Sequence, residues 1–331
     1  MSGVFRAAAP VRLDLAGGWT DVPPYSAREG GVVVSAAIGL YASAEVQPGG
    51  SGFRLASEDL GAGVELPADA VLSASGPLAL LQAGLRMLPV GPCALTTRSD
   101  APPGSGLGSS GALDVALVAA LAAARGETPD VAGIAHLACR LEREEAWIPG
   151  GRQDQFTAAF GGFLRLEFKD PAATVERLAL DAALLAELER RMLLVYTGAS
   201  RFSGATIGRV MRAYERGDRP VTQALHGLRQ VAERMAEALA AGDLTRIGAL
   251  LDANWAHQQA LDPAMCTPLM ERLAHAMRGA GALGGKAAGS GAGGSMFFLG
   301  PEDPSEAAEA VRRMGMTVLP VQWAATGVRA C

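Results

Sequence analysis

The sequence has little charge, few aromatic residues and almost no lysine. Charged residues make up 19% of the 331 residues, aromatic residues 5%, and the net charge is −5 without any block of like charges. A mildly acidic chain of this kind has no electrostatic footprint for nucleic acid. Because 49% of the residues are hydrophobic, disorder is excluded as well. We therefore expect a folded protein without a nucleic-acid partner.

Cysteine and histidine are scarce and scattered. The four cysteines, Cys93, Cys139, Cys266 and Cys331, form no C-x-x-C pair, and no histidine stands at metal-ligand spacing from a cysteine or another histidine. This pattern argues against a disulfide framework and against a zinc site. It is typical of a reduced, cytoplasmic protein.

Long apolar runs are missing too. The longest weakly polar stretch, from Ala112 to Ala124, contains Asp114 and is shorter than the roughly 20 residues that a membrane-spanning helix needs. The first ten residues hold no apolar run of the length of a secretory signal. We expect no membrane partner.

Glycine, in contrast, is abundant, with 42 residues, or nearly twice its usual frequency. One of the two lysines, Lys286, lies in the densest glycine run, from Gly279 to Gly294. A P-loop of the type GxxxxGK[ST] would need a glycine at position 280 and a hydroxyl residue after the lysine, but Ala280 and Ala287 stand there. Lys286 therefore does not mark a P-loop.

Strands and helices are predicted in separated runs, which indicates an α+β fold. Expected strands are Val11–Leu15, Gly31–Ile38, Leu40–Val46, Cys93–Arg98, Gly161–Phe168, Leu193–Thr197, Met296–Leu299 and Met316–Trp323. Helices are expected over Ser109–Ala124, Val131–Trp147, most of Ser203–Met277 with breaks near residues 217, 242 and 262, and Pro304–Met314. A polar, poorly patterned stretch between Pro171 and Leu193 predicts two domains, 1–180 and 181–331.

A glycine-rich segment, Gly104-Ser-Gly-Leu-Gly-Ser-Ser-Gly111, precedes the first strong helix. Glycines let backbone N–H groups turn inward around an anion, and the following helix adds its positive N-terminal end. The hydroxyls of Ser109 and Ser110 suit a phosphate or a metal ion, although an ordinary glycine turn with a serine N-cap has the same composition. We predict a phosphate-binding loop.

The same segment also fits a dinucleotide-binding fingerprint. Gly106 to Gly111 matches G-x-G-x-x-G, a motif that should follow a strand directly and open a βαβ unit. Here Pro102 and Pro103 intervene, and no βαβ unit with an acidic strand end follows. The phosphate loop is therefore favoured over a dinucleotide site.

Two other segments place carboxylates on constrained turns. Asp154 follows the pair Gly150-Gly151 near a predicted helix start, which suits either a general base or a simple helix N-cap. Asp21 ends a segment from Arg12 that contains a Gly-Gly turn. Its carboxylate suits the hydroxyls of a polyhydroxylated ligand, although surface alternation along a strand gives a similar pattern.

Two acids lie on or beside the apolar face of the helix predicted over residues 131–147. Glu142 and Glu145 each continue a row of apolar residues spaced by four. A carboxylate in such a place usually has a partner or a metal ion. Helix periodicity does not choose between the two.

Taken in order, these segments resemble the motifs of the GHMP kinases, the family of galacto-, homoserine, mevalonate and phosphomevalonate kinases. Ala9 to Asp21 is similar to the first motif, and Pro102 to Ala112 is similar to the second, P-x-x-x-G-L-G-S-S-A-A, with Gly111 in place of alanine. Lys286 to Gly294 resembles the third, glycine-rich motif, in which we expect the glycines to matter more than the charge of the lysine. The third segment departs from the motif at Ser290, Ala292 and Ser295.

The resemblance covers nearly the whole chain and implies a fold and a set of roles. The fold would combine an N-terminal domain like ribosomal protein S5 domain 2 with a ferredoxin-like C-terminal domain. Asp154 would be the general base with Arg12 beside it, and Mg²⁺ would be held by Ser110 and Glu142. ATP would contact Pro103, Gly104, Ser105, Gly106, Leu107, Gly108, Ser109, Ser110, Gly289, Ser290 and Gly291. The substrate would contact Gly18, Trp19, Thr20, Asp21, Gly151, Arg152 and Arg201, the two arginines meeting a substrate phosphate.

Within the family, the segments around Asp21 and Asp154 resemble the sugar 1-kinase branch of D-glycero-D-manno-heptose 7-phosphate kinases and L-fucokinases. The length of the chain favours the heptose enzyme, which makes a 1,7-bisphosphate for the nucleotide-activated heptose of surface polysaccharides. Trp19 leans toward the fucose enzyme, because heptose enzymes often have a glycine there. A non-catalytic sensor of sugar and ATP and a decarboxylating relative are further alternatives, and a homo-oligomer stays open.

Overall fold

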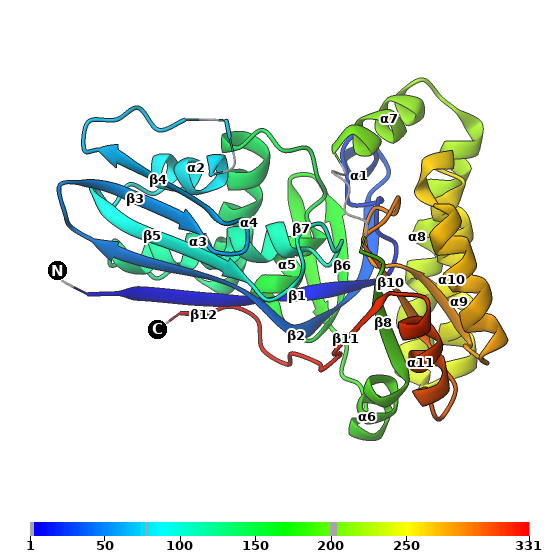
Figure 1. The fold of residues 1–331 in the computed structure, drawn as a ribbon. Coiled ribbons are helices and arrows are strands. Elements are labelled where there is room, and N and C mark those ends of the chain that lie inside the picture. Colours follow the sequence, from blue (N-terminus) through cyan, green and yellow to red (C-terminus); the bar gives the residue numbers. More distant parts are fainter. Residues whose placement is uncertain (1–2, 74, 77, 199–203, 331) are drawn as a thin grey trace.

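In the computed structural model the chain forms two bodies that lie side by side, each built on its own sheet (Figure 1). The structure describes residues 3–73, 75–76, 78–198 and 204–330. Strands of the first sheet are β1 (Phe5–Ala16), β2 (Gly31–Pro48), β3 (Gly52–Ser57), β4 (Ala62–Pro67), β5 (Cys93–Ser99), β6 (Phe163–Lys169), β7 (Ala172–Arg177) and β12 (Arg329–Ala330). The second sheet contains β8 (Met192–Tyr196), β9 (Gly284–Ala287), β10 (Ser295–Leu299) and β11 (Thr317–Leu319).

Strand β2 organises the first sheet because it pairs with a different partner over each half of its second edge. One edge runs antiparallel to β1, while the other pairs with β6 over residues 31–36 and with β5 over residues 42–48. The order is β12-β1-β2-β5-β3-β4, with the β6–β7 hairpin attached to the first half of β2. The sequence predicted two separate strands here, but the chain continues through Gly39 as one.

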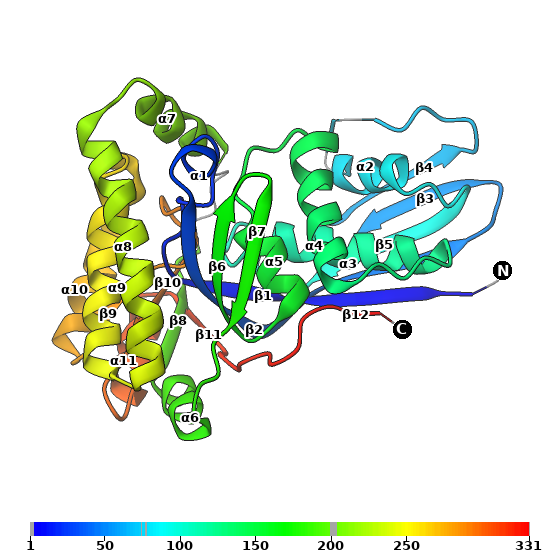
Figure 2. The ribbon, with the colours of Figure 1, turned by 180° about the vertical axis from the view of Figure 1, so that it is seen from behind.

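Helices cover the first sheet, and most of the second body is helical. The first body holds α1 (Tyr25–Arg28), α2 (Ala79–Met87), α3 (Ser109–Ala124), α4 (Val131–Arg140), the π-helical turn η1 (Leu141–Glu145) and α5 (Gln153–Phe160). The rest of the chain holds α6 (Ala182–Arg191), α7 (Gly204–Glu215), α8 (Arg219–Ala241), α9 (Leu244–Gln259), the 3-10 turn η2 (Pro263–Met265), α10 (Pro268–Gly279) and α11 (Ser305–Arg313). Figure 2 shows from behind how α8 and α9 run beside the strands of both sheets.

The predicted helix breaks are confirmed, and each has a local cause. The side chain of Asp218 accepts from the N–H of Val221 and starts α8, and Gly242 ends α8 in a left-handed conformation. Asp243 and Asp262 cap α9 and η2 in the same way. Helix α3 also begins and ends where the sequence predicted it.

The helix predicted over residues 131–147 is present to Glu145, but its hydrogen bonding changes in its second half. Helix α4 ends at Arg140, and the chain widens into η1, where the N–H of Ala146 donates to the carbonyl of Leu141 five residues earlier. The last predicted strand is also shorter than expected, because only Thr317–Leu319 pairs as β11. Strands β3, β4, β7 and β9 and helix α2 were not predicted.

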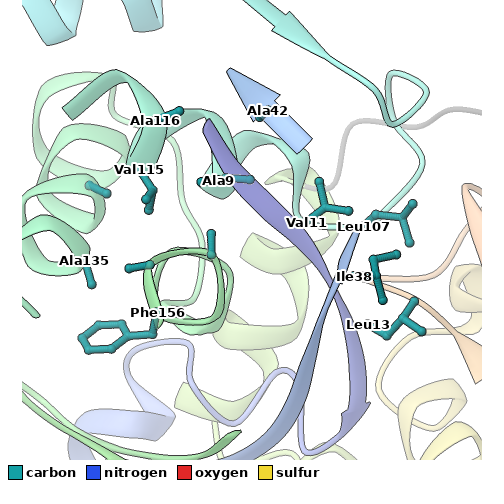
Figure 3. Close-up of a cluster of buried hydrophobic side chains, with 14 of the residues drawn as sticks. Ala9, Val11, Leu13, Ile38, Ala42, Leu107, Val115, Ala116, Ala135 and Phe156 are labelled. Carbon is teal, nitrogen blue, oxygen red and sulfur yellow. The ribbon is translucent and has the colours of Figure 1, made fainter. Parts of the chain in front are cut away.

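The buried core follows from the alternation along β1. Val11 and Leu13 point into it, whereas Arg12 and Asp14 point to the opposite face. Figure 3 shows part of this core, formed by β1, β2 and the helices that cover them. The labelled side chains are Ala9, Val11, Leu13, Ile38, Ala42, Leu107, Val115, Ala116, Ala135 and Phe156.

The two bodies share this core, because the cluster continues into α8 and α9 through residues such as Met235 and Leu251. The end of the chain also returns to the first sheet, where β12 pairs with β1 and Trp323 bridges to Ile38. A division at residue 180 stays a prediction. The last strand of the chain, β12, belongs to the first sheet and not to the second. Among the described helices, none combines the length and the apolar character that crossing a bilayer requires.

Candidate active site

A cleft of about 330 Å³ lies where the two bodies meet. Most of its lining comes from four stretches of the chain that the sequence singled out, namely the Gly18–Asp21 turn, the Gly104–Ser110 loop, the segment from Gly150 to Asp154, and the Gly289–Gly294 loop. The fold thus brings segments from near both ends of the chain into one site.

The Gly104–Ser110 loop is shaped by glycines in the left-handed region. Gly104, Gly106 and Gly108 have φ of 68°, 76° and 74°, values that residues with a side chain rarely adopt. Gly108 is the N-cap of α3, and no side chain caps the first turn of that helix. The N-terminus of α3 therefore opens toward the cleft, as a phosphate-binding loop requires.

Two hydroxyls of this loop are buried without a partner among the described residues, namely Oγ of Ser105 and Oγ of Ser109. Buried polar atoms are normally hydrogen-bonded, so these two groups fit a ligand that completes them. Two residues expected to contact ATP lie elsewhere: Leu107 packs fully buried beneath the loop, and Pro103 is exposed outside the cleft lining.

The second glycine loop closes the cleft with its backbone. A Cβ atom added to Gly289 would lie 2.6 Å from the carbonyl oxygen of Gly106, so the two loops approach too closely for a side chain. Gly289, Ser290 and Gly291 all line the cleft, as predicted. The side chain of Gln258 donates to the carbonyl of Gly289 at 2.7 Å and holds the loop in place.

Asp154 and Arg12 form an ion pair at the centre of the cleft. Nε of Arg12 donates to Oδ1 of Asp154 at 2.8 Å, and Nη1 donates to the carbonyls of Gly106 and Ala288. The side chain of Arg12 is 6% exposed and that of Asp154 is 29% exposed. Burial lowers the pKa of Arg12, but the charges of Asp154 and Asp14 outweigh it and leave the pKa raised. Arg12 is thus a fixed cation beside a carboxylate that a ligand can reach.

The interpretation of Asp154 as a helix N-cap does not hold. Helix α5 starts at Gln153, and the N-cap position belongs to Arg152. The carboxylate that satisfies the start of α5 is that of Asp21, whose Oδ2 accepts from the N–H groups of Arg152 and Gln153 at 2.7 and 3.0 Å. Asp154 is left to pair with Arg12.

The predicted metal ligands touch each other. Oγ of Ser110 donates to Oε1 of Glu142 at 3.1 Å, and Nε2 of Gln155 donates to Oε2 at 2.7 Å. Burial, followed by the charge of Asp154, raises the pKa of Glu142 to about 7. Glu145 does not line the cleft. The structure therefore places Glu142, and not Glu145, at the site.

Behind Glu142 lies a second buried carboxyl group that the sequence did not single out. Asp114 is fully buried on α3, one turn after Ser110, and its Oδ2 accepts from the Gln155 amide at 3.3 Å. Burial raises its pKa, and the neighbouring Glu142 adds to the effect. As the only charged residue of α3, Asp114 was visible in the sequence, but its partners were not.

The turn that we expected to bind substrate divides into ligand-facing and structural residues. Gly18, Trp19, Asp21 and Gly151 line the cleft. Burial raises the pKa of Asp21 to about 6, and its Oδ1 has no partner among the described residues. Thr20, in contrast, is fully buried, and its hydroxyl donates to the carbonyl of Gly17, so it holds the turn and does not face the cleft.

Arg152 is also misplaced in the sequence-based prediction. Its guanidinium lies over the ring of Phe168, forms an ion pair with Asp170 at 2.6 Å, and donates to the carbonyls of Pro171 and Ala172. These contacts engage both of its Nη atoms, and Arg152 is absent from the lining of the cleft, so its guanidinium is held away from a ligand bound there. Arg201, the other candidate, lies outside the described residues.

Asp14 and Lys286 were not predicted as site residues. Asp14 lines the cleft, two residues after Arg12 on β1, and Nζ of Lys286 forms an ion pair with it at 2.8 Å. The alternation along β1 places Asp14 on the face of Arg12, and this was the available signal. Lys286 gave no such signal, because its partner lies 272 positions away in the chain.

Comparison with known proteins identifies the family. Residues 73–162 match the model of the GHMP kinase N-terminal domain, and residues 235–315 match that of the GHMP kinase C-terminal domain. The chain is 32% identical over 303 residues to the D-glycero-alpha-D-manno-heptose 7-phosphate kinase of Campylobacter jejuni, covering 89% of this chain and 88% of that protein. The chain is a GHMP kinase.

Two further proteins are similar to this GHMP kinase, one in sequence and one in structure. The bifunctional fucokinase/GDP-fucose pyrophosphorylase of Arabidopsis thaliana is 28% identical over 338 residues, which are 93% of this chain but only 31% of that longer protein. A crystal structure of a D-glycero-D-manno-heptose 1-phosphate kinase from Bacteroides thetaiotaomicron matches with a TM-score of 0.79 and 28% identity, covering 99% of this chain and 98% of that one. The predicted α+β GHMP kinase fold is confirmed, and the enzyme is a phosphotransferase with an alcohol group as acceptor.

Proposed function

We propose that this GHMP kinase transfers the γ-phosphoryl group of ATP to the anomeric hydroxyl of D-glycero-D-manno-heptose 7-phosphate and forms the 1,7-bisphosphate. The observation that carries the proposal is the Arg12–Asp154 pair, which lies in one cleft between the glycine-rich phosphate loop and the Gly18–Asp21 turn. The substrate is chosen from the similarity over 89% of the chain to a heptose 7-phosphate kinase. The product would feed nucleotide-activated heptose for surface polysaccharides.

The residues present fit ATP and a magnesium ion. The unpartnered hydroxyls of Ser105 and Ser109 and the open N-terminus of α3 suit phosphate oxygens. Ser110 and Glu142 offer a hydroxyl and a carboxylate in contact, the oxygen ligands that Mg²⁺ prefers. Among the described residues, no group of three or more His, Cys, Asp or Glu could hold a metal by itself. This agrees with Mg²⁺, which usually shares one or two carboxylates with substrate phosphates.

Three side chains that line the cleft have separate parts in the proposed transfer. Asp154 accepts the proton of the attacking hydroxyl at its exposed carboxylate. Arg12 fixes that carboxylate and stabilises negative charge on the phosphoryl group in transit. Bound Mg²⁺ would offset the charge of the phosphate oxygens. Asp21, with one oxygen committed to α5, offers Oδ1 to a sugar hydroxyl.

The lining of the cleft favours an acceptor without a phosphate group, such as L-fucose or another free sugar. Trp19 forms an apolar wall of the cleft with Val22 and Ile207. Arg12 is the single cation among the described lining residues, and it is already paired with Asp154. A substrate 7-phosphate would therefore depend on Arg201, which we keep as the candidate for that contact.

The acceptor is tested by measuring ADP release with ATP, Mg²⁺ and a panel of heptose 7-phosphate, the free heptose and L-fucose. We expect sustained turnover with heptose 7-phosphate and a kcat/KM at least tenfold lower with the other two sugars. Faster turnover with L-fucose would replace the heptose proposal with the alternative. Binding of sugar and ATP without turnover in any arm would indicate a sensor.

Arg201→Ala tests the contact with the 7-phosphate separately from the choice of sugar. If Arg201 meets the 7-phosphate, KM for heptose 7-phosphate rises while KM for the free heptose does not change. Losing one charge-assisted hydrogen bond should raise KM by roughly 10- to 150-fold. An equal effect on both sugars would remove Arg201 from the phosphate contact.

A further inference from the structure

One of the two lysines of the chain is wholly buried at the junction of the two sheets. Nζ of Lys286, on β9, donates to Oδ2 of Asp14 at 2.8 Å and to the carbonyl oxygen of the same residue at 2.6 Å. It also lies 5.6 Å from the centre of the Phe297 ring. Both side chains are nearly inaccessible, with 0% exposure for Lys286 and 4% for Asp14. Burial lowers the pKa of Lys286, and the charge of Asp14 opposes that effect.

A pair of this kind is not needed for a stable fold. Removing two charges from water costs several kcal/mol per ion, and well-packed apolar residues often replace a buried ion pair without loss of stability. The second body already contacts the first through apolar packing of α8 and α9. The location of the Asp14–Lys286 pair at the cleft therefore explains its presence better than a contribution to the stability of the fold does.

The pair lies directly beneath the substrate end of the cleft. Asp14 lines the cleft and lies two residues after Arg12 on the same face of β1, roughly 6.6 Å farther along the strand. Its Oδ1 accepts from the N–H of Gly18 at 3.3 Å, and Gly18 opens the turn that carries Trp19 and Asp21. Asp14 therefore stands between the transfer centre at Arg12 and the turn that we propose for sugar binding.

The carboxylate of Asp14 has accepting capacity left. An ionised carboxylate offers about four lone-pair sites on its two oxygens. Lys286 and Gly18 account for one contact on each oxygen. The ammonium fixes the rotation of the carboxylate, and the lysine is itself fixed by its second bond to the Asp14 carbonyl.

We infer that Asp14 accepts a hydrogen bond from a hydroxyl of the acceptor sugar other than the one that is phosphorylated, and that Lys286 is the positioning residue that holds Asp14 for it. The inference rests on the proposed function only in taking a sugar as the acceptor. It makes Asp14 a residue that determines specificity, through one hydroxyl at some distance from the reacting centre. Lys286 acts through Asp14 and does not touch the sugar.

The test removes both charges together, because either single change leaves a buried charge unpaired. Asp14→Leu/Lys286→Met replaces the pair by apolar side chains, and Lys169→Met is the matched control at the exposed lysine. We expect KM for the sugar to rise by roughly 10- to 150-fold in the double variant. KM for ATP should change less than threefold, and Lys169→Met should leave both constants unchanged.

A panel of monodeoxy analogues of the accepted sugar separates a lost contact from a change of shape. In the wild type, one analogue with the reacting hydroxyl intact should lose roughly the same 10- to 150-fold in kcat/KM. In the double variant the ratio of parent sugar to that analogue should fall to nearly one, because the contact is absent from both. A steric effect of the leucine would lower every sugar alike and leave the ratio unchanged.

If the apolar pair does not fold, Asp14→Asn/Lys286→Gln gives the same comparison with a neutral hydrogen-bonded pair. The ratio for the matched analogue should then fall at least threefold below the wild-type ratio. Equal ratios in wild type and folded variant for every analogue would overturn the inference, as would a rise in KM for ATP alone. A wild type that phosphorylates no sugar would instead overturn the proposed function, before any variant is made.

Discussion

The two bodies contribute to the cleft in different ways. The first body supplies the side chains that do chemistry, including Arg12, Glu142 and Asp154, from β1, η1 and α5. The second body supplies mainly backbone, through the Gly289–Gly294 loop, and a buried ammonium that does not line the cleft. The charged side chains that line the cleft thus come from the first body, and the backbone that closes over the phosphate loop comes from the second.

Glycines in the two loops meet two different needs. In the Gly104–Ser110 loop, and at Gly291, Gly293 and Gly294 of the second loop, the backbone has a positive φ. At Gly289 the need is for space, because the backbone of Gly106 lies where a side chain would be. A substitution at Gly289 should therefore fail for a different physical reason than one at Gly106 or Gly108.

The largest effect is expected at the charged centre of the first body. Asp154→Asn removes the proton acceptor while keeping the shape of the side chain, and kcat should fall roughly 10²- to 10⁴-fold. The melting temperature should change little, since Arg12 keeps its bonds to Gly106 and Ala288. The measurement is steady-state ADP release, with the exposed Asp69→Asn as control. Turnover near that of the wild type would remove Asp154 as the base.

The next effect tests closure by the second body. Gly289→Ala should push the loop away from Gly106 and lower kcat/KM for ATP roughly 10- to 100-fold, as small displacements of positioning groups do. Gly279→Ala is the matched control in the same glycine run, since no atom lies within 4 Å of its added Cβ. If both variants have the same kcat/KM, the close approach of the two loops has no part in ATP binding.

The dependence of stability on pH tests the buried carboxyl group of Glu142. Its pKa is about 7 in the folded chain against 4.5 without burial, so between these values the folded state holds a proton that the unfolded state has lost. Unfolding therefore becomes easier as pH rises through this window, by up to about 3 kcal/mol. Thermal melts of wild type and Glu142→Gln from pH 4 to 8 should show the wild type losing stability relative to the variant. A constant difference would contradict the raised pKa, and added Mg²⁺ should reduce the loss because it binds the ionised form.

The smallest kinetic effect is expected at Arg152, which belongs to the first body but points away from the cleft. Arg152→Met breaks a buried pair with Asp170 and should destabilise the fold by about 3 kcal/mol. KM for heptose 7-phosphate in the folded variant should change less than threefold. Chemical denaturation and steady-state kinetics measure the two quantities. A large rise in that KM with unchanged stability would indicate that Arg152 contacts the substrate.

Local signals made part of this structure predictable. Helix α3 was placed correctly because a glycine loop precedes an uninterrupted run of helix-forming residues. The breaks around α8 and α9 followed from Asp and Gly at positions where they cap helices. The resemblance to the GHMP motifs then gave the fold and named most of the residues that meet in the cleft.

Long-range contacts account for what was missed. The π-helical turn that carries Glu142 depends on packing and not on a local pattern, and β9 lies in a glycine run without strand periodicity. Arg152 was assigned to a substrate phosphate because it is a basic residue beside Asp154 in the sequence, whereas its own partners come from the β6–β7 hairpin. Lys286 was expected to matter less than its glycines, yet it is buried against Asp14.

The most direct test of the central proposal is the position of the phosphoryl group in the product. Wild-type enzyme, ATP, Mg²⁺ and the accepted sugar are incubated, and the product is examined by ³¹P and ¹³C NMR. Activation of an anomeric hydroxyl by Asp154 predicts one new phosphate ester with phosphorus coupled to C1 of the sugar. Phosphorus on any other carbon, or release of inorganic phosphate without a sugar ester, would contradict it.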